Sequence, residues 1–249
     1  DFYLMRDVPH GTVHMEYFPS SVTGRTRLCY VYTPPGYEEN GEKTYPVLYL
    51  QHGGGENETG WIWQGKANLI SDNLLAEGKA PEVIIVMNCL YCMKEGMQDA
   101  FLAGDFDAML CKDCIPFIEG KYRVDPSRRA MAGLSMGSYQ TVMTSLYHLG
   151  MFSYIGIFSG LMEKRWYSRQ DYFQAFEDAK DFRKKVKLFF FGYGRQEERI
   201  VKGLSQEFAM LEEKGIPYES YSCDGYHEWT VWRRCLREFL CRMGQEECE

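Results

Sequence analysis

The chain has 249 residues, 45% of them hydrophobic, and a formal net charge of −7 from 28 basic and 35 acidic residues. This length can bury a large core, and we expect one soluble domain over residues 1–249. The chain has no basic block of the kind that binds nucleic acid, and no apolar run approaches the roughly 18 residues of a membrane span.

The chain begins with "DFYLMRDVPHG", which has no initiator Met, basic n-region or apolar h-region. We therefore expect that a signal peptide was removed or that the domain was cut from a longer chain. After this Pro- and Gly-bearing stretch, seven apolar segments predict strands. In chain order they read "RLCYVYTP", "PVLYLQHG", "EVIIVMN", "RRAMAGLS", "YIGIFSG", "VKLFFFG" and "PYESYSC".

Amphipathic stretches between these strands predict helices. They cover Lys66 to Glu77, Phe106 to Glu119, Met136 to Tyr147, Asp171 to Ala179, Leu204 to Lys214 and Trp229 to Cys241. Continuous apolar strands that alternate with helices indicate an α/β fold, with a mostly parallel sheet covered by helices on both faces. In such sheets, ligand sites gather at the carboxyl ends of the strands.

Nine cysteines are too few for a disulfide scaffold in a chain of this length. Cys89, Cys92, Cys111 and Cys114 match the C-x₂-C pairs of a structural zinc site. However, Cys111 and Cys114 belong to an apolar helical stripe, and cysteine often serves as a small buried hydrophobe. We favour the core interpretation and expect no metal or organic cofactor.

One predicted strand ends in Gly133-Leu-Ser135-Met-Gly137 and continues into a helix. This is the context of a nucleophile elbow, a tight turn that exposes a serine hydroxyl. The alternative is a serine that caps the helix between two turn glycines.

A second strand ends in His52-Gly-Gly-Gly55, like the glycine loop whose N–H groups help to build an oxyanion hole. We expect His52 to support this loop through a hydrogen bond. His227 follows the last predicted strand, where an α/β-hydrolase carries its catalytic base. The alternatives are an ordinary glycine turn and a structural histidine.

The mechanism then needs a carboxylate between Ser135 and His227, at a strand end. The strand "LFFFGYG" is followed by Glu197 and Glu198, and Asp181 and Asp224 are weaker candidates. A dinucleotide fingerprint fails here because its sixth position is Glu197. The alternative for the glutamate pair is a solvated helix start.

These motifs together resemble the feruloyl esterases of carbohydrate esterase family 1, of the bacterial xylanase-associated type in the esterase D-like branch of the α/β-hydrolases. The likeness runs nearly end to end, through "DVPHGTV", "YVYTPPGY", "YPVLYLQHGGGENETGW", "ANLISDNLLAEGKAPEVIIVM", "IPFIEGKYRV", "RAMAGLSMG", "FSYIGIFSG" and "GYHEWTVW".

The resemblance implies an α/β-hydrolase fold with Ser135 as nucleophile and His227 as base. It also implies that the N–H groups of Met136 and Gly54, with Gly53 as the alternative donor, form the oxyanion hole. The implied substrates are hydroxycinnamate esters on the arabinose side chains of plant xylan, which makes a secreted or periplasmic location the expectation. A carbohydrate-binding or xylanase domain outside this chain is a further expected partner.

Two positions depart from the family pattern. The elbow continues as Gly137-Ser138 where relatives have two glycines, and Glu197 stands where they usually carry aspartate. Because glutamate is longer by one methylene, its loop must lie further from His227 to keep the contact.

A phenolic acyl group needs an aromatic or apolar slot beside Ser135, although any side chain proposed for it could instead be core. The candidates are Trp61, Trp63, Leu90, Tyr91, Phe101, Tyr226 and Trp229. Trp232, three residues beyond Trp229 on the last helix, is expected in the core.

We thus expect a serine esterase that acts through Ser135, His227 and Glu197. The alternatives are an esterase or acyltransferase for another small acyl group, and an inert carbohydrate-binding module with a degenerate triad.

Overall fold

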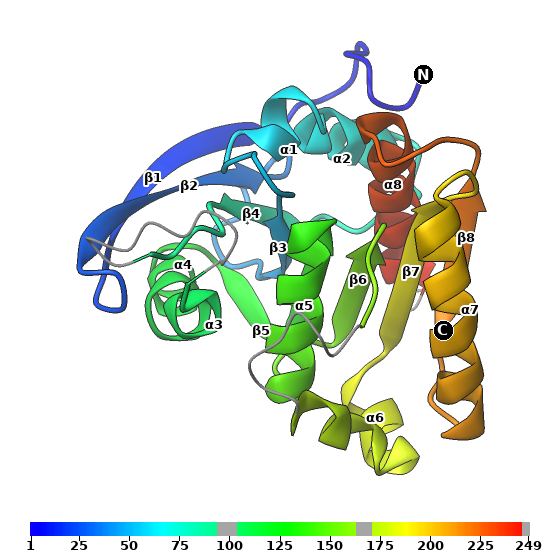
Figure 1. Cartoon of the computed structure of the whole chain (residues 1–249). Helices are drawn as coiled ribbons and strands as arrows, with labels where there is room; N and C mark the ends of the chain where they lie inside the picture. The colour runs from blue at the N-terminus through cyan, green and yellow to red at the C-terminus, as the bar shows by residue number, and fades with distance from the viewer. Residues whose placement is uncertain (94–103, 163–170, 246–249) are drawn as a thin grey trace.

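The structure is a computed structural model and describes residues 1–93, 104–162 and 171–245. An eight-stranded sheet in the order β1-β2-β4-β3-β5-β6-β7-β8 runs through the described residues (Figure 1). The strands are β1 Thr12–Ser20, β2 Arg25–Thr33, β3 Tyr45–Gln51, β4 Ile84–Asn88, β5 Val124–Leu134, β6 Tyr154–Phe158, β7 Leu188–Gly194 and β8 Glu219–Cys223.

The sheet is parallel from β4 through β3, β5, β6 and β7 to β8, whereas β1 and β2 are antiparallel. The predicted mostly parallel sheet is therefore confirmed. Strand β1 was not predicted, because its buried positions include Glu16 and Ser20 while Met15 and Tyr17 face solvent. An edge strand with this pattern lacks the apolar alternation that predicts a strand.

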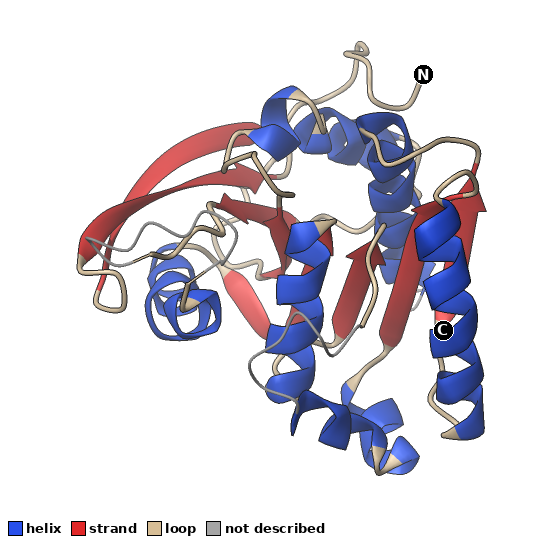
Figure 2. Cartoon of the chain, viewed as in Figure 1, coloured by secondary structure: helices blue, strands red, loops and turns tan. Residues whose placement is uncertain are grey.

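Helices cover both faces of the sheet (Figure 2). Helices α1 Gly60–Trp63, α2 Ala67–Ala76 and α8 Trp229–Gln245 pack over a core that contains Leu48 and Leu50. The opposite core contains Val47 and Tyr49 and is covered by the other helices. These are α3 Phe106–Met109, α4 Ile115–Lys121, α5 Met136–Tyr147, α6 Ala179–Lys185 and α7 Glu198–Glu213. Among the described residues, no helix has the length and hydrophobicity needed to cross a bilayer.

Three predicted helices differ in detail. The segment from Phe106 contains a π-helical turn, η1 Leu110–Cys114, between α3 and α4. The segment from Asp171 is a 3-10 helix, η3 Asp171–Phe176, and α6 begins after it. Helix α7 begins at Glu198 rather than at the predicted Leu204. The prediction missed the first turn because only Ile200 there is on the buried side, which gives a weak apolar signal.

The carboxyl ends of the parallel strands lie at one edge of the sheet, and their register aligns them. Gln51 pairs with Gly133, and Leu134 with Phe158. Phe158 in turn pairs with Gly192. The loops that follow β3, β5, β6, β7 and β8 therefore meet in one place, which is where the candidate residues lie.

Candidate active site

Ser135 lies at the sharp turn between β5 and α5, with φ 51° and ψ −117°. Its backbone N–H donates to the carbonyl of Phe158 over 2.9 Å. A side chain is excluded on both sides of the turn, since a Cβ on Gly133 would lie 2.4 Å from the Gly137 carbonyl oxygen. A Cβ on Gly137 would lie 2.3 Å from the His52 carbonyl oxygen. The Ser135 side chain makes no capping hydrogen bond, so the strained turn matches an elbow rather than a helix cap.

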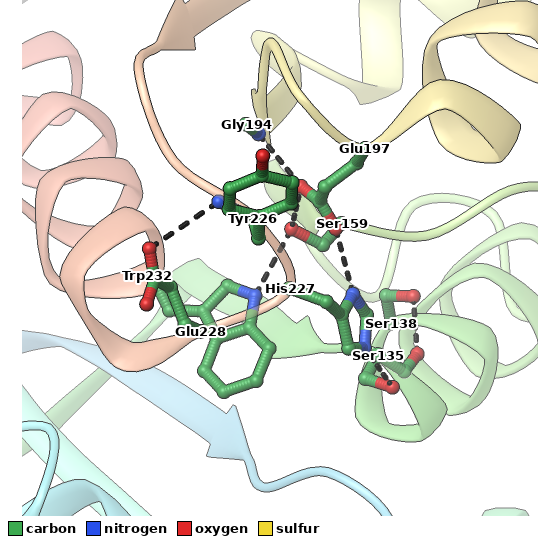
Figure 3. Close-up of polar contacts among 9 residues, drawn as sticks. All are labelled: Ser135, Ser138, Ser159, Gly194, Glu197, Tyr226, His227, Glu228 and Trp232. Atoms are coloured by element: carbon green, nitrogen blue, oxygen red, sulfur yellow. Dashed lines mark hydrogen bonds and ion pairs between the residues drawn. The ribbon is translucent and has the colours of Figure 1, made fainter.

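The side chains of Ser135, His227 and Glu197 form a continuous hydrogen-bonded chain (Figure 3). Ser135 Oγ lies 2.8 Å from His227 Nε2, and His227 Nδ1 lies 2.7 Å from Glu197 Oε1. Because a carboxylate only accepts hydrogen bonds, Nδ1 carries the proton and leaves Nε2 to accept from the serine hydroxyl. The predicted contacts are present, and the catalytic roles of the three residues stay a prediction.

Glu197, rather than Glu198, reaches His227. Its side chain is only 3% exposed, and its Oε2 accepts from the Gly194 N–H over 2.6 Å. Glu198 is exposed in the first turn of α7. The weaker candidates are paired elsewhere, Asp181 with Lys185 and Asp224 with Arg195.

The loop that carries Glu197 is bonded to the loop that carries His227. Arg195 N–H donates to the Cys223 carbonyl over 2.8 Å, and Gln196 N–H donates to the Gly225 carbonyl over 3.2 Å. These backbone hydrogen bonds fix the distance between the two loops. The longer glutamate is thereby accommodated without loss of the histidine contact.

Two further residues surround the acid and were not assigned a site role from the sequence. Ser159 Oγ lies 2.7 Å from Glu197 Oε2 and 3.0 Å from Trp232 Nε1. Trp232 is buried as expected, and it also packs edge-on against the His227 ring at 5.0 Å between centroids. The available signal for Ser159 was its position just after a buried strand, the same rule that singled out Ser135.

The glycine loop after β3 lies against the elbow, because a Cβ on Gly53 would lie 3.4 Å from Ser135 Cβ. His52 supports this loop as expected. Its Nδ1 donates to the Gly53 carbonyl over 2.8 Å, and its Nε2 accepts from the Leu90 N–H over 3.0 Å. Burial lowers the pKa of His52 to about 4, so the imidazole stays neutral and keeps both bonds.

Glu56 connects the same loop to the start of α8. It accepts from the Gly53 N–H over 3.3 Å and from the Trp229 indole N–H over 3.0 Å. Among the described residues, the Gly54 and Met136 N–H groups have no acceptor. Of the predicted oxyanion donors, these two are therefore available to a ligand, whereas Gly53 is already engaged.

The "Putative esterase" family model matches residues 20–243. The chain belongs to this esterase family. It is 39% identical over 247 residues to an endo-1,4-beta-xylanase/feruloyl esterase of Xylanibacter ruminicola. That match covers 96% of the chain but only 32% of the relative, so the chain spans about a third of the relative's length.

Solved structures of other esterases share the fold. A ferulic acid esterase superimposes with a TM-score of 0.80 at 26% identity, covering 95% of this chain and 98% of the other. An S-formylglutathione hydrolase from Staphylococcus aureus gives a TM-score of 0.77 at 16% identity, with 97% and 99% covered. The chain thus has the α/β-hydrolase fold that the sequence predicted, and the family to which it belongs is an esterase family.

The residues proposed to line a slot for the acyl group differ in their burial. Trp61 and Leu90 are corrected to core residues, because Trp61 is 1% exposed with its indole N–H on the Gln51 carbonyl, and Leu90 is 0% exposed. Trp63 is 66% exposed, and it does not line the cavity beside Ser135. Phe101 lies outside the described residues.

The remaining candidates lie close to the site. Tyr91 accepts from the Gly55 N–H over 2.8 Å, and Trp229 is bonded to Glu56, so both support the glycine loop. Tyr226 is exposed and lines a cavity of about 510 Å³ beside Ser135. Among the described residues, its lining is Ser135, Tyr139, Ser159, Glu197, Glu198, Arg199, Ile200, Tyr226 and His227.

Tyr139 and Ile200 are lining residues that sequence reasoning missed. Tyr139 is four residues beyond Ser135, and Ile200 is three residues beyond Glu197. On a helix these spacings place a side chain on the same face as the earlier residue. That periodicity was the signal that would have found both.

The four cysteines of the zinc motif do not converge in the part of the chain that the structure describes. Cys92 and Cys114 are buried in the core, in line with the core interpretation. Cys111 is instead near Asp107 and His148, the group among described residues whose donor atoms lie within metal-binding distance of one another. In this group His148 Nε2 already contacts Asp107 Oδ1 at 3.0 Å, so a hydrogen bond accounts for this contact.

Proposed function

We propose that this esterase is a feruloyl esterase, which hydrolyses ferulate and p-coumarate esters on plant arabinoxylan through an acyl-enzyme. The observation that carries the proposal is the hydrogen-bonded chain from Ser135 through His227 to the buried Glu197, beside an open cavity. A strained serine whose hydroxyl contacts an oriented imidazole is the arrangement that nucleophilic catalysis requires.

Ser135 Oγ attacks the ester carbonyl carbon while His227 Nε2 accepts the hydroxyl proton. Glu197, which is held in its buried site by the Gly194 N–H, orients the imidazole and stabilises its positive charge. The Met136 and Gly54 N–H groups donate to the developing oxyanion. The ester C–O bond then breaks, and the sugar hydroxyl leaves with the proton from His227.

The acyl-enzyme that remains carries the hydroxycinnamoyl group on Ser135 Oγ. His227 accepts a proton from a water molecule, whose oxygen attacks the acyl carbon. The bond between that carbon and Ser135 Oγ then breaks, and His227 returns the proton to Oγ, which releases the free acid and restores the serine hydroxyl. Release of both products restores the starting enzyme, and no cofactor takes part in the proposed cycle.

The cavity supports a flat phenolic acyl group. Tyr139, Ile200 and Tyr226 offer aromatic and apolar contacts, and Glu198 and Arg199 offer polar contacts at the same cavity. A volume of about 510 Å³ falls within the usual range for small-molecule sites, and it exceeds what a formyl or acetyl group fills. The name of the Xylanibacter ruminicola relative supports the same substrate class and a neighbouring xylanase domain.

Product analysis tests this function. The purified chain is incubated with methyl ferulate, a feruloylated arabinoxylan oligosaccharide, p-nitrophenyl acetate and S-formylglutathione, and the released acids are quantified. We expect the highest kcat/KM on the feruloyl esters and a Ser135-linked feruloyl mass in acid-quenched samples. Faster turnover of S-formylglutathione or the acetyl ester, with ferulate untouched, would assign the site to another acyl group.

A sugar acceptor added to the same assays separates hydrolysis from acyl transfer. We expect free ferulate to remain the main product, because the proposed mechanism uses water in the second step. A feruloylated acceptor as the dominant product would instead identify an acyltransferase.

A further inference from the structure

The short segment Phe158–Ser159–Gly160 at the end of β6 contacts the surroundings of all three site residues. The Phe158 carbonyl accepts from the Ser135 N–H over 2.9 Å, and the Ser159 N–H donates to the Gly192 carbonyl over 2.8 Å. Ser159 has φ 49°, a left-handed conformation that is strained for a residue other than glycine. Backbone strain at this position indicates that Ser159 has a role other than ending strand β6.

The direction of each Ser159 hydrogen bond follows from its partners. An indole N–H can only donate, so Trp232 Nε1 donates to Ser159 Oγ over 3.0 Å. A carboxylate can only accept, so the Ser159 hydroxyl donates to Glu197 Oε2 over 2.7 Å. Ser159 is 2% exposed, and its hydroxyl therefore has one orientation, toward the Glu197 carboxylate.

These bonds decide which carboxylate oxygen meets the histidine. Glu197 Oε2 accepts from both Ser159 and the Gly194 N–H, at 2.7 and 2.6 Å. Oε1 is left to accept from His227 Nδ1. Glutamate has one more rotatable bond than aspartate, so anchoring one oxygen is what fixes the other in line with the imidazole.

We propose that Ser159 is a positioning residue that acts through Glu197 to hold His227 in line with Ser135. Trp232 completes this arrangement, because its indole N–H donates to Ser159 Oγ and its ring packs edge-on against the His227 ring (Figure 3). The inference rests on the proposed roles of Ser135, His227 and Glu197, but it does not depend on which ester is the substrate.

A purely structural role for Ser159 is the alternative. It would explain the backbone bond to Gly192, but not why the side chain donates to the buried carboxylate. The two explanations differ in what happens when Glu197 is already disabled. A positioning residue then has nothing left to position, whereas a structural residue still contributes to folding.

The test uses Ser159→Ala and Ser159→Gly, and the glycine variant suits the positive φ. Ser145→Ala is the matched control, because Ser145 is equally buried in α5 and donates to the Thr141 carbonyl over 2.6 Å. Three quantities are measured: kcat and KM on a soluble ester, and the rate at which a fluorophosphonate probe labels Ser135. Thermal unfolding of each variant is followed in parallel.

We expect both Ser159 variants to lower kcat by about tenfold to a hundredfold, the effect of losing one charge-assisted hydrogen bond. KM should change less than about twofold, and labelling should slow by the same factor as kcat, since the same proton transfer limits both. Ser145→Ala should leave both rates unchanged.

The variant that combines Ser159→Ala with Glu197→Gln is the decisive experiment, because it separates a positioning role from a structural one. We expect the double variant to be no slower than Glu197→Gln alone, because the serine acts only through the carboxylate. Additive losses, or unchanged kcat in both Ser159 variants, would overturn the proposal. Trp232→Phe, which removes the indole N–H but keeps a ring, should lower kcat by a smaller factor of about threefold to tenfold.

The substrate assignment fails separately from this inference. If methyl ferulate is not hydrolysed but the probe labels Ser135, labelling rates still test Ser159. Absence of labelling in the unmodified protein would overturn the roles of Ser135, His227 and Glu197, and the role of Ser159 with them.

Discussion

Ser135 and Ser159 immediately follow neighbouring strands, and both have a positive φ, of 51° and 49°. Their strands pair in register, with Leu134 opposite Phe158. The two hydroxyls nevertheless have opposite surroundings, since Ser135 Oγ meets the partly exposed His227 and Ser159 Oγ is enclosed by Glu197 and Trp232. Backbone strain alone therefore does not identify a nucleophile. The groups around the hydroxyl decide its role.

The glycines beside the two serines avoid steric overlap with different groups. Gly133 and Gly137 allow the elbow backbone to fold against itself and against the His52 carbonyl. A Cβ on Gly160 would instead lie 1.7 Å from the Ser138 hydroxyl. Ser138 donates to the Ser135 carbonyl over 2.5 Å, so the extra serine of this elbow is accommodated by bonding back to the turn.

The sharpest test of the contrast is Ser135→Ala. Loss of the proposed nucleophile should lower kcat by roughly 10⁴-fold to 10⁶-fold, while the melting temperature stays close to that of the unmodified protein. Ester hydrolysis and thermal unfolding measure the two effects. A loss no larger than that of Ser159→Ala would mean that the two serines are not functionally different.

The second test identifies the acid by comparing the matched variants Glu197→Gln and Glu198→Gln. We expect Glu197→Gln to lower kcat by about 10³-fold to 10⁴-fold, because an amide favours the wrong imidazole tautomer. Glu198→Gln should change kcat less than about threefold, since Glu198 lines the cavity but the carboxylate bonded to His227 Nδ1 is that of Glu197. The reverse order, measured on the same ester, would make Glu198 the acid.

Most of the parallel sheet and the elbow could be predicted from the sequence, because both leave strong local signals. Buried strands such as β3 are continuous apolar runs, and the glycines at 133 and 137 flank a serine at a fixed spacing. Glu197 could be placed within a pair, since chain order and strand ends limit the acid to one loop. The choice between the two glutamates needed the geometry.

What could not be predicted depends on contacts between distant segments. Ser159 and Trp232 are 73 positions apart in the chain, and no local pattern links them. The burial of Trp61 has the same origin, because its ring packs edge-on against Phe158 and Trp229, which lie far later in the chain. Strand β1 was missed because Glu16, a charged residue, is buried where it bonds to Tyr122 and Lys121, its partners about a hundred residues later.

The elbow's need for glycine can be tested by stability. Gly137→Ala should lower the free energy of unfolding by about 3 kcal/mol or more, because its Cβ would overlap the His52 carbonyl. Gly120→Ala is the matched control in α4, where a Cβ meets no atom within 4 Å, and it should stabilise by about 0.5–1 kcal/mol. Urea unfolding measures both, and equal effects would remove the steric explanation.

The smallest expected effect concerns His52, which supports the elbow from the side opposite to Ser159. Burial lowers its pKa from 6.5 to about 4, so the unfolded chain binds a proton on this group more readily than the folded one. Its contribution to stability is therefore present above pH 6.5 and is lost as the pH falls toward 4.

Between pH 7 and pH 5 this group should account for about 2 kcal/mol of lost unfolding free energy. His52→Gln does not titrate in this range, and its amide oxygen can accept from the Leu90 N–H in place of Nε2. The variant should thus lose less stability than the unmodified protein over the same pH interval, as measured by urea unfolding at each pH. Parallel pH dependences would mean that His52 is not the neutral support of the glycine loop.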